Sequence, residues 1–306
     1  NFLDERGFLE VETPVLQPIY GGANAKPFKT YHNALDQELY LRIADELYLK
    51  RLVIGGFERV YEISKDFRNE GMDRSHNPEF TMLEFYWAYS DFIDNMKMVE
   101  DLIRKTAKIV NSSIIIQGDT KIDLTKPFAQ RSFFDLLEES VGHDLSKMNK
   151  NDLAKICQSN DVDIDPTFNI GKMLDELMSK KVEPLLIQPT FIIDYPKILS
   201  PLAKKHRNGD PNLVERFELF IGGTEFANAF TELNDPIDQR ERLEQQASFR
   251  DLGDDEAQAV DENFIQAVEC GMPPTGGVGI GIDRLTMLLT SNRWIKDVIL
   301  FPAMRH

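Results

Sequence analysis

The alternation of apolar and polar positions predicts short strands, several of them consecutive, and a smaller set of amphipathic helices. Period-2 alternation and runs of β-branched or aromatic residues predict strands over residues 8–13, 39–43, 59–68, 80–89, 185–193, 215–231 and 276–282. Helical spacing predicts helices over residues 45–53, 91–110, 238–250 and 261–269, and a last long helix that begins at Asp283. Hairpins of consecutive strands, with one late strand–helix unit, favour an α+β fold with an antiparallel sheet over a doubly wound βαβ fold.

From about residue 131 to residue 184 the pattern changes. This stretch predicts several short amphipathic helices joined by polar connections, and it contains few strand-forming residues. We interpret it as a helical insertion. The chain of 306 residues is long enough for one large domain with such an insertion, and its 42% apolar content supplies a sizeable core.

The predicted strand over residues 80–89 has two unlike faces. One face is wholly apolar and suits the core: Leu83, Phe85 and Trp87. The other face mixes aromatic and polar side chains: Phe80, Met82, Glu84 and Tyr86. Taken alone, this mixed face suits either a cleft or an exposed sheet surface.

The loop before that strand favours the cleft. A guanidinium group, a carboxylate and further cationic groups fall within one predicted hairpin: Arg68, Glu70, Arg74 and His76. Such a cluster suits a polyphosphate, because a guanidinium fork binds phosphate oxygens and the carboxylate can accept a hydrogen bond from a purine amino group.

A second candidate site lies around Gly222 and Gly223, a two-residue hairpin signal between apolar strands. The candidate metal ligands here are Glu218 and Glu225. If Ile221 pairs with Thr224, these two glutamates become diagonal neighbours on one face, with Cα atoms about 7–8 Å apart. Two carboxylates at that spacing can share a hard cation such as Mg²⁺. Two solvated glutamates on an edge hairpin would show the same pattern.

Three further side chains follow on the same predicted strand. Asn228, Phe230 and Glu232 alternate onto one face, with the opposite parity to Glu225. All four can line one site only if a β-bulge lies between Glu225 and Asn228, so we predict a bulge there.

Glycines at alternate positions leave one face of the strand over residues 276–282 bare. A flat ligand or another backbone can approach such a face, and close packing of a helix on the sheet would explain it equally well. Asp283 and Arg284 stand where the next helix begins. The stretch is not a dinucleotide-binding fingerprint, because it lacks the G-x-G-x-x-G spacing and no βαβ unit follows it.

Composition narrows the class of protein. A net charge of −16 excludes binding of nucleic acid by global attraction, so such a partner needs a local basic patch or a further domain. Cys157 and Cys270 show neither paired nor metal-ligand spacing, which indicates a reducing compartment and hence the cytoplasm. No apolar run is long enough to cross a membrane, and no basic-then-apolar leader opens the chain. Because the chain opens at Asn1 within a helical pattern, we expect an excerpt from a longer protein.

Together the blocks resemble the class II aminoacyl-tRNA synthetases in their order and spacing. Residues 1–14 resemble the end of motif 1, residues 59–89 motif 2 and residues 276–290 motif 3, so the resemblance covers essentially all of residues 1–306. The amino-acid sequence is similar to that of lysyl-tRNA synthetases in particular over residues 21–25, 68–71, 76–80, 225–228 and 298–305. The resemblance implies a catalytic domain with an antiparallel sheet flanked by helices, a helical insertion at about 131–184, and an N-terminal anticodon-binding OB domain that is absent from this chain.

The resemblance also implies roles for single residues. It assigns Arg68 to the ATP α-phosphate and the lysine carboxylate, as the catalytic residue, and the rest of the ATP site to Glu70, His76, Phe80 and Arg284. It assigns lysine to Gly22, Glu46, Glu84, Tyr86, Asn228, Phe230 and Glu232, and Mg²⁺ to Glu218 and Glu225. The acidic side chains agree with a lysine substrate on physical grounds, because a buried ammonium group is costly unless it is paired.

The implied reaction joins L-lysine to ATP as lysyl-adenylate and transfers lysine to the 3′ end of tRNA(Lys), releasing AMP and pyrophosphate. The expected partners are ATP, L-lysine, tRNA(Lys) and a second copy of the chain in a cytoplasmic homodimer, with no membrane. Without the OB domain, we expect the chain to form the adenylate but to charge tRNA poorly.

Two alternatives remain. The related ligase that attaches a lysine-type amino acid to elongation factor P lacks the OB domain, but it tends to carry a larger residue where this chain has Gly279, and residues 21–25 follow the synthetase wording. A non-catalytic synthetase-like module commonly loses the arginine of motif 2 or of motif 3. Both Arg68 and Arg284 are present here.

Overall fold

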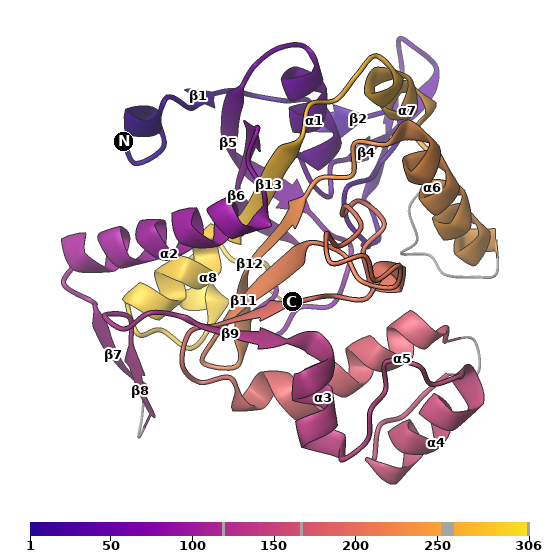
Figure 1. Cartoon of the computed structure of the whole chain (residues 1–306). Coiled ribbons are helices and arrows are strands. Elements are labelled where there is room, and N and C mark those ends of the chain that lie inside the picture. Colours follow the sequence, from indigo (N-terminus) through magenta and orange to yellow (C-terminus); the bar gives the residue numbers. More distant parts are fainter. Residues whose placement is uncertain (118–119, 166–167, 252–259, 305–306) are drawn as a thin grey trace. The chain divides into compact units, whose positions relative to one another are not determined.

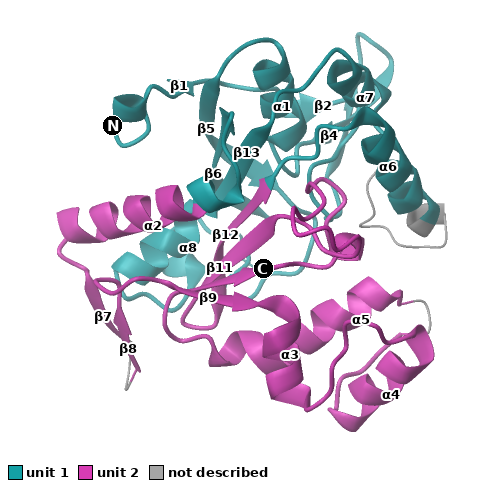
Figure 2. Ribbon diagram, viewed as in Figure 1, with its two compact units in different colours: residues 1–95, 231–306 teal, residues 96–230 magenta. Residues whose placement is uncertain are grey.

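A computed structural model describes residues 1–117, 120–165, 168–251 and 260–304, with the backbone alone for residue 117 and residues 249–251. The chain forms two compact units: unit 1, residues 1–95 and 231–306, and unit 2, residues 96–230 (Figure 2). Both units combine helices with strands that are mostly antiparallel (Figure 1), so the α+β prediction is confirmed. Arg305, which falls in the similarity over residues 298–305, lies outside the described residues.

Unit 1 holds the predicted hairpin and the glycine-rich strand. Its elements are β1 (Leu9–Glu10), β2 (Leu16–Gln17), β3 (Lys29–His32), β4 (Gln37–Leu41), α1 (Glu46–Ile54), β5 (Arg59–Phe67), β6 (Glu79–Ala88), α6 (Pro236–Asp251), α7 (Glu262–Glu269), β13 (Thr275–Gly281) and α8 (Ile282–Leu289), with 3-10 turns at Asp4–Arg6 and Ile295–Asp297. Strands β1, β5, β6 and β13 pair in that order, with only the β1–β5 pair parallel. The hairpin predicted over residues 59–89 is confirmed as β5–β6, with Phe67 opposite Glu79 and Arg59 opposite Trp87.

Helix α1 packs on this sheet through its apolar face. Leu49 and Val53 are buried against Val60 of β5 and Tyr86 of β6. The helix begins where the sequence predicts, and the side chain of Asp45 at its N-cap makes no capping hydrogen bond. Its Oδ1 lies 3.0 Å from Nε of Arg42 instead. The Asp45 carboxyl group is thus paired with a buried guanidinium group rather than with the amides of the helix.

Unit 2 holds the hairpin that carries Glu218 and Glu225, which we call the acidic hairpin. Its elements are α2 (Phe92–Ile109, whose first residues belong to unit 1), β7 (Ile114–Gln117), β8 (Thr120–Asp123), β9 (Ala129–Ser132), α3 (Phe133–Val141), α4 (Lys150–Ser159), α5 (Ile170–Leu177), a π-helical turn (Met178–Val182), 3-10 turns at Glu183–Leu185 and Lys197–Leu199, β10 (Thr190–Ile193), β11 (Arg216–Ile221) and β12 (Thr224–Thr231). Strands β12, β11, β10 and β9 pair in that order, and only β9 and β10 run parallel.

The helices between residues 133 and 185 pack on the strands of unit 2 through one apolar cluster. Phe133 and Leu177 from the helices are buried with Ile192 of β10 and Phe220 of β11. This stretch has the helical content that its pattern predicts. The bounds of an insertion at about 131–184 stay a prediction.

Three predicted strands differ from their expected bounds: two are shorter and one is shifted. The strand predicted over residues 185–193 begins only at Thr190, directly after Pro189, because proline has no N–H to donate to a sheet; Leu185 ends a 3-10 turn instead. The strand predicted over residues 8–13 is reduced to β1, because Thr13 turns to Glu62 and donates its hydroxyl at 2.7 Å. The strand predicted over residues 39–43 appears as β4, which ends at Leu41. None of the described helices combines the length and the apolar character that a membrane span requires.

Candidate active site

The mixed face of β6 is buried in unit 1 at Glu84 and Tyr86 and half-buried at Phe80 and Met82. The side chains of Glu84 and Tyr86 are only 6% and 3% exposed, so the exposed sheet surface that the strand alone also allowed is ruled out. The Tyr86 hydroxyl donates to Oε2 of Glu84 at 3.1 Å. Burial places a carboxylate and a phenol together, which costs free energy unless each finds polar partners.

Two more carboxylates join them from other elements of unit 1. Glu46 lies in the first turn of α1, and Glu232 directly follows Thr231, where its N–H donates to the carbonyl of Thr275 at 2.8 Å. Both side chains are buried, and both act electrostatically on the Tyr86 hydroxyl. We call Glu46, Glu84, Tyr86 and Glu232 the acidic cluster. The structure therefore brings together the residues predicted to take the ammonium groups of lysine.

A lysine that the sequence analysis did not single out sits in this cluster. Lys50, one turn after Glu46 on α1, is fully buried, and its ammonium group forms ion pairs with both Glu46 and Glu232. The spacing of four residues between Glu46 and Lys50 was a local signal for this pair, because side chains at that spacing are neighbours on a helix. The contact from Lys50 to Glu232 had no local signal, because 182 positions separate them (232 − 50).

Burial controls the ionisation of the cluster. It raises the pKa of Glu232 to about 8, with Lys50 lowering the pKa and Glu46 raising it. Burial also raises the pKa of Glu84 well above its usual value, helped by Asp45, Asp66 and Glu46. Burial would lower the pKa of Lys50, but the carboxylates of Glu232 and Glu46 raise it instead. Lys50 is therefore charged at neutral pH, and the carboxylates compete for the few cations near them.

Two glycines let backbone approach the cluster. Gly22 has a φ of +89°, and a Cβ there would lie 3.1 Å from Cβ of Glu46. A Cβ on Gly277 of β13 would overlap Oε1 of Glu232 and lie 2.5 Å from Cε1 of Tyr86. Of the two explanations for the glycine-rich strand, close approach to this site therefore holds at Gly277.

The predicted ATP residues form two contacts in unit 1. Arg68, just after β5, has Cζ 5.1 Å from the centre of the Phe80 ring on β6. Arg284 in the first turn of α8 donates to Nε2 of His76 at 3.0 Å. Because Nε2 is then the acceptor, Nδ1 of His76 carries the proton and bonds Oδ2 of Asp73 at 2.8 Å. Glu70 is exposed in the same loop.

The start of α8 is tied to β6 beside Phe80. The Thr81 N–H donates to Oδ2 of Asp283 at 2.6 Å. That bond brings the helix turn that carries Arg284 close to the strand that carries Phe80. Two residues far apart in sequence are thereby brought to one side of unit 1, as the predicted adenine site requires.

Behind Arg68 lies a buried charge network that the sequence analysis missed. Arg42 contacts Asp45 at 3.0 Å, Glu62 at 2.8 Å and Asp66 at 3.4 Å, and all of these side chains are buried. Burial raises the pKa of Asp45 to about 8, helped by the charges of Asp66 and Glu62 and opposed by Arg42. Burial also raises the pKa of Asp66 to about 6, helped by Glu62 and opposed by Arg68 and Arg42.

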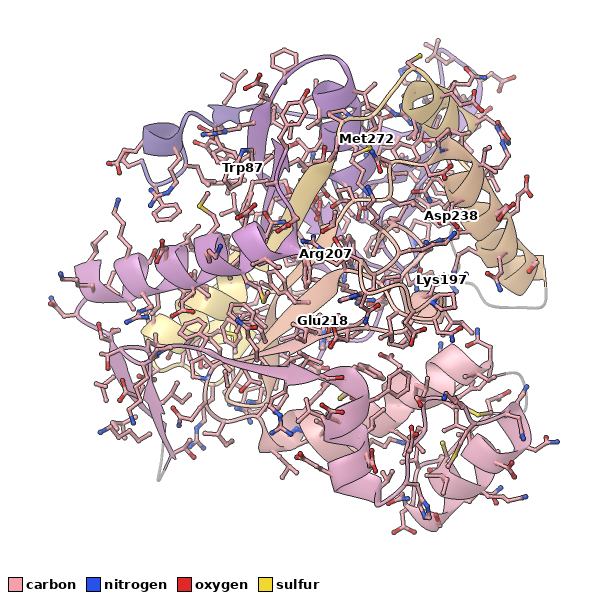
Figure 3. All side chains as sticks on the ribbon, viewed as in Figure 1. Trp87, Lys197, Arg207, Glu218, Asp238 and Met272 are labelled. Atoms are coloured by element: carbon pink, nitrogen blue, oxygen red, sulfur yellow. The ribbon has the colours of Figure 1, made fainter. Side chains whose placement is uncertain are left out.

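The acidic hairpin of unit 2 pairs as predicted. Ile221 lies opposite Thr224 and Phe220 opposite Glu225, and the register shifts so that Leu219 meets Ala227. The bulge predicted between Glu225 and Asn228 is thereby confirmed, and it brings Asn228 directly opposite Glu218. Glu218 lies on β11 (Figure 3).

Two partners of Glu218 were not singled out from the sequence. Arg216 pairs with Oε1 of Glu218 and donates to Oδ1 of Asn228 at 3.2 Å, and its Cζ lies 5.5 Å from the Phe230 ring. The Tyr195 hydroxyl donates to Oε2 of Glu218 at 2.7 Å. Burial and the nearby carboxylate of Glu225 raise the pKa of Glu218, while the charge of Arg216 lowers it, and the pKa is about 7 as a result.

This arrangement bears on a metal ion. Among the described residues, no group of three or more His, Cys, Asp or Glu side chains is assembled as a metal cage. Mg²⁺ usually keeps several waters and takes only one or two protein carboxylates together with nucleotide phosphates, so two glutamates are enough for that mode. The repulsion between Glu218 and Glu225 also fits, since a cation between them would relieve it. We conclude that these residues suit Mg²⁺ with a nucleotide.

Comparison with known proteins places this geometry in a family. A family profile described as tRNA synthetases class II (D, K and N) matches residues 1–305. The chain belongs to this family. Several relatives are named Lysine–tRNA ligase. That of Porphyromonas gingivalis is 52% identical over 306 residues, which cover 53% of its length, and that of Christiangramia forsetii is 51% identical over 306 residues, which cover 54% of its length. The one from Roseiflexus sp. is 55% identical over 315 residues and 63% covered, and each alignment takes in 100% of this chain.

These class II synthetase relatives confirm the resemblance to lysyl-tRNA synthetases that the motifs indicated. The chain spans between about half and two thirds of the length of the relatives, from 53% to 63%. The roles assigned to single residues by the resemblance stay predictions, and they are taken up next.

Proposed function

We propose that this chain carries the amino-acid activation site of a lysine–tRNA ligase. The site joins L-lysine to ATP as lysyl-adenylate, and the whole protein then transfers lysine to the 3′ end of tRNA(Lys), releasing AMP and pyrophosphate. The main support is the acidic cluster, because buried carboxylates are stable as anions only beside cations, and lysine brings two ammonium groups. The names of the relatives support tRNA, rather than elongation factor P, as the acceptor.

The proposal gives each end of lysine its own partners. Glu46 and the Gly22 backbone take the α-amino group, and Asn228 takes the carboxylate. Glu232 and Tyr86 take the ε-ammonium group, with Glu84 bonded to Tyr86 behind it. Phe230 lies along the aliphatic stem. An uncharged amino acid of similar size would leave buried carboxylates without counter-ions, which is the physical basis for selecting lysine.

ATP is assigned to the motif 2 and motif 3 residues. Phe80 and Arg284 hold the adenine, and Glu70 accepts from its amino group. His76 contacts the outer phosphates, and the Arg284–His76 hydrogen bond then breaks so that each side chain can meet the nucleotide. Glu218 and Glu225 would hold Mg²⁺ with the phosphates, and the bound ion supplies charge neutralisation at the phosphate oxygens.

Activation is an in-line displacement at the α-phosphorus. The lysine carboxylate is ionised at neutral pH, so no general base is needed. Its oxygen forms a bond to the α-phosphorus while the bond to the bridging oxygen of the β-phosphate breaks, and pyrophosphate leaves. Arg68 binds the α-phosphate and the carboxylate together, which orients the reactants and stabilises the negative charge in the transition state.

The family resemblance also supports a cytoplasmic homodimer as the working form of the whole protein. Motif 1, with which residues 1–14 are similar, is a dimer element of this family. The proposal therefore includes a second copy of the protein as a partner.

ATP–pyrophosphate exchange with each of the twenty amino acids tests the proposal. We expect exchange that depends on lysine. Arg68→Ala should lower lysine-dependent exchange by about a hundredfold or more, because it removes a guanidinium from the reacting phosphate. Arg104→Ala, which removes a guanidinium from the α2 surface ion pair with Glu100, is the matched control and should exchange normally.

Two results would contradict this assignment. Normal exchange in Arg68→Ala, with its fold intact by circular dichroism, would remove Arg68 from the reaction. Exchange that depends on another amino acid would refute the lysine assignment.

A further inference from the structure

Lys50 is the only lysine among the described residues that is fully buried. Its ammonium group pairs with Oε1 of Glu46 and with Oε2 of Glu232, and it lies 5.9 Å from the centre of the Phe264 ring on α7. The second carboxylate oxygen of Glu232, Oε1, is buried and accepts no hydrogen bond from the described residues. A buried cation thus binds one oxygen of Glu232, while the other oxygen lacks a donor.

Two buried carboxylates this close together do not both stay ionised unless a cation lies between them. Each ion loses its hydration, and the like charges repel, so one of them binds a proton instead. A protonated Glu232 would be a poor counter-ion for a ligand ammonium group. The ammonium of Lys50 offsets both effects, because it attracts both carboxylates at once.

We propose that Lys50 is a positioning residue for recognition of lysine. By binding one oxygen of Glu46 and one of Glu232, it holds both carboxyl groups in place, favours the ionised form of each, and leaves Oε1 of Glu232 to accept the ammonium group of the ligand. Lys50 does not touch the reacting atoms. The inference rests on the proposed function and adds a residue that the family resemblance did not assign.

Other charged and titratable groups face this pair from each neighbouring element. They are Glu46 on α1, Glu84 and Tyr86 on β6, and, acting on Glu84 from farther away, Asp45 and Asp66. All of these groups are acids, and α7 contributes the uncharged Phe264. Lys50 is therefore the cation on which the ionisation of Glu232 depends, and the pKa of Glu232 is raised to about 8 even in its presence.

The test is the affinity for lysine of the whole chain from about pH 6 to pH 9, measured by calorimetry for the wild type, Lys50→Met and Lys50→Arg. Lys50→Met should bind lysine about tenfold or more weakly at pH 7, since each unit of pKa rise at Glu232 lowers its ionised fraction up to tenfold. The deficit should narrow as pH rises and Glu232 ionises. Lys50→Arg keeps the charge and should retain the wild-type pH profile. Lys108→Met, which removes an exposed lysine from α2, is the matched control and should bind normally.

A measurement without ligand tests the same point. Carbon-13 NMR follows the carboxyl carbon of Glu232, whose signal is assigned by its loss in Glu232→Gln. This signal should titrate at higher pH in Lys50→Met than in the wild type. If Lys50→Met does not fold, Lys50→Met/Glu232→Gln, which lacks the carboxylate deprived of its counter-ion, should fold.

Several results would overturn the inference. They are an unchanged Glu232 titration, tighter lysine binding by Lys50→Met, a deficit equal at all pH values, and failure of both the single and the double variant to fold. Failure of the wild type to bind lysine would instead refute the proposed function, while the Glu232 titration would still test the role of Lys50.

Discussion

Single residues in this protein owe their chemistry to burial more than to their type. Glu84 and Glu70 are both glutamates of the β5–β6 hairpin, yet Glu84 is buried, with a pKa well above its usual value, and Glu70 is exposed in the loop. Glu232 is held ionisable by one buried ammonium group. A single added methyl group is therefore enough to disturb the site, and we expect the largest effect at Gly277.

Gly277→Ala should weaken lysine binding and destabilise the fold. The new methyl group would overlap the Glu232 carboxylate and press on the Tyr86 ring, so we expect a loss of about 1–3 kcal/mol in the free energy of unfolding. Urea denaturation and lysine titration measure the two effects. Gly71→Ala is the control, because a Cβ there meets no atom within 4 Å. Equal stability of the two variants would show that Glu232 and Tyr86 move aside freely.

Elements are joined at the site by charged side chains that link one to the next. Arg42, just after β4, binds Asp45 ahead of α1 and Glu62 and Asp66 on β5. It also donates to the carbonyl of Thr13 at 3.1 Å, near the end of the segment similar to motif 1. One guanidinium therefore fixes where several elements meet, directly behind Arg68.

Arg42→Met should be strongly destabilising. It keeps most of the side-chain volume but leaves three buried carboxylates without their cation, which typically costs about 3–5 kcal/mol. Urea denaturation followed by circular dichroism would measure the loss. Arg240→Met breaks an exposed ion pair with Glu262 and should leave the unfolding midpoint nearly unchanged. Similar midpoints for the two variants would contradict a structural role for the Arg42 network.

Over the whole molecule, acidic residues outnumber basic ones, and some of the acidic side chains are buried. The net charge is −16, and several carboxyls are buried with a raised pKa, including Asp45 and Glu232 at about 8, Glu218 at about 7 and Asp66 at about 6. In the unfolded chain these groups titrate near pH 4. Between about pH 4 and pH 8 the folded protein therefore holds protons that the unfolded chain has released.

The unliganded protein should therefore lose stability as pH rises from about 5 to 8.5. When the folded state binds more protons, the free energy of unfolding falls with increasing pH; the fall is steepest between the unfolded pKa values near 4 and the raised folded values, and it levels off above them. Urea midpoints at several pH values measure the slope. Asp45→Asn and Glu232→Gln should each flatten it, and lysine with Mg-ATP should reduce it by supplying cations to the buried acids. A midpoint that rises with pH over this range would contradict the prediction.

Local patterns in the sequence predicted much of the fold. The alternation over residues 59–89 predicted the β5–β6 hairpin, and the parity change between Glu225 and Asn228 required the bulge that the register shows. Such features depend on neighbouring residues and on the period of a strand or helix, so a single sequence carries them. Strand ends were less predictable, as at Thr190, where pairing begins directly after Pro189.

The sequence by itself determined the fold class and the order of the motifs, and it predicted the residue types for phosphate, magnesium and lysine. Only the tertiary structure decided that the mixed face of β6 is buried, that Asp45 serves Arg42 rather than the helix, and that Lys50 joins Glu46 to Glu232. The physical reason is that desolvation and the pairing of charges depend on which distant segments pack together, and that information is not local to any stretch of the chain.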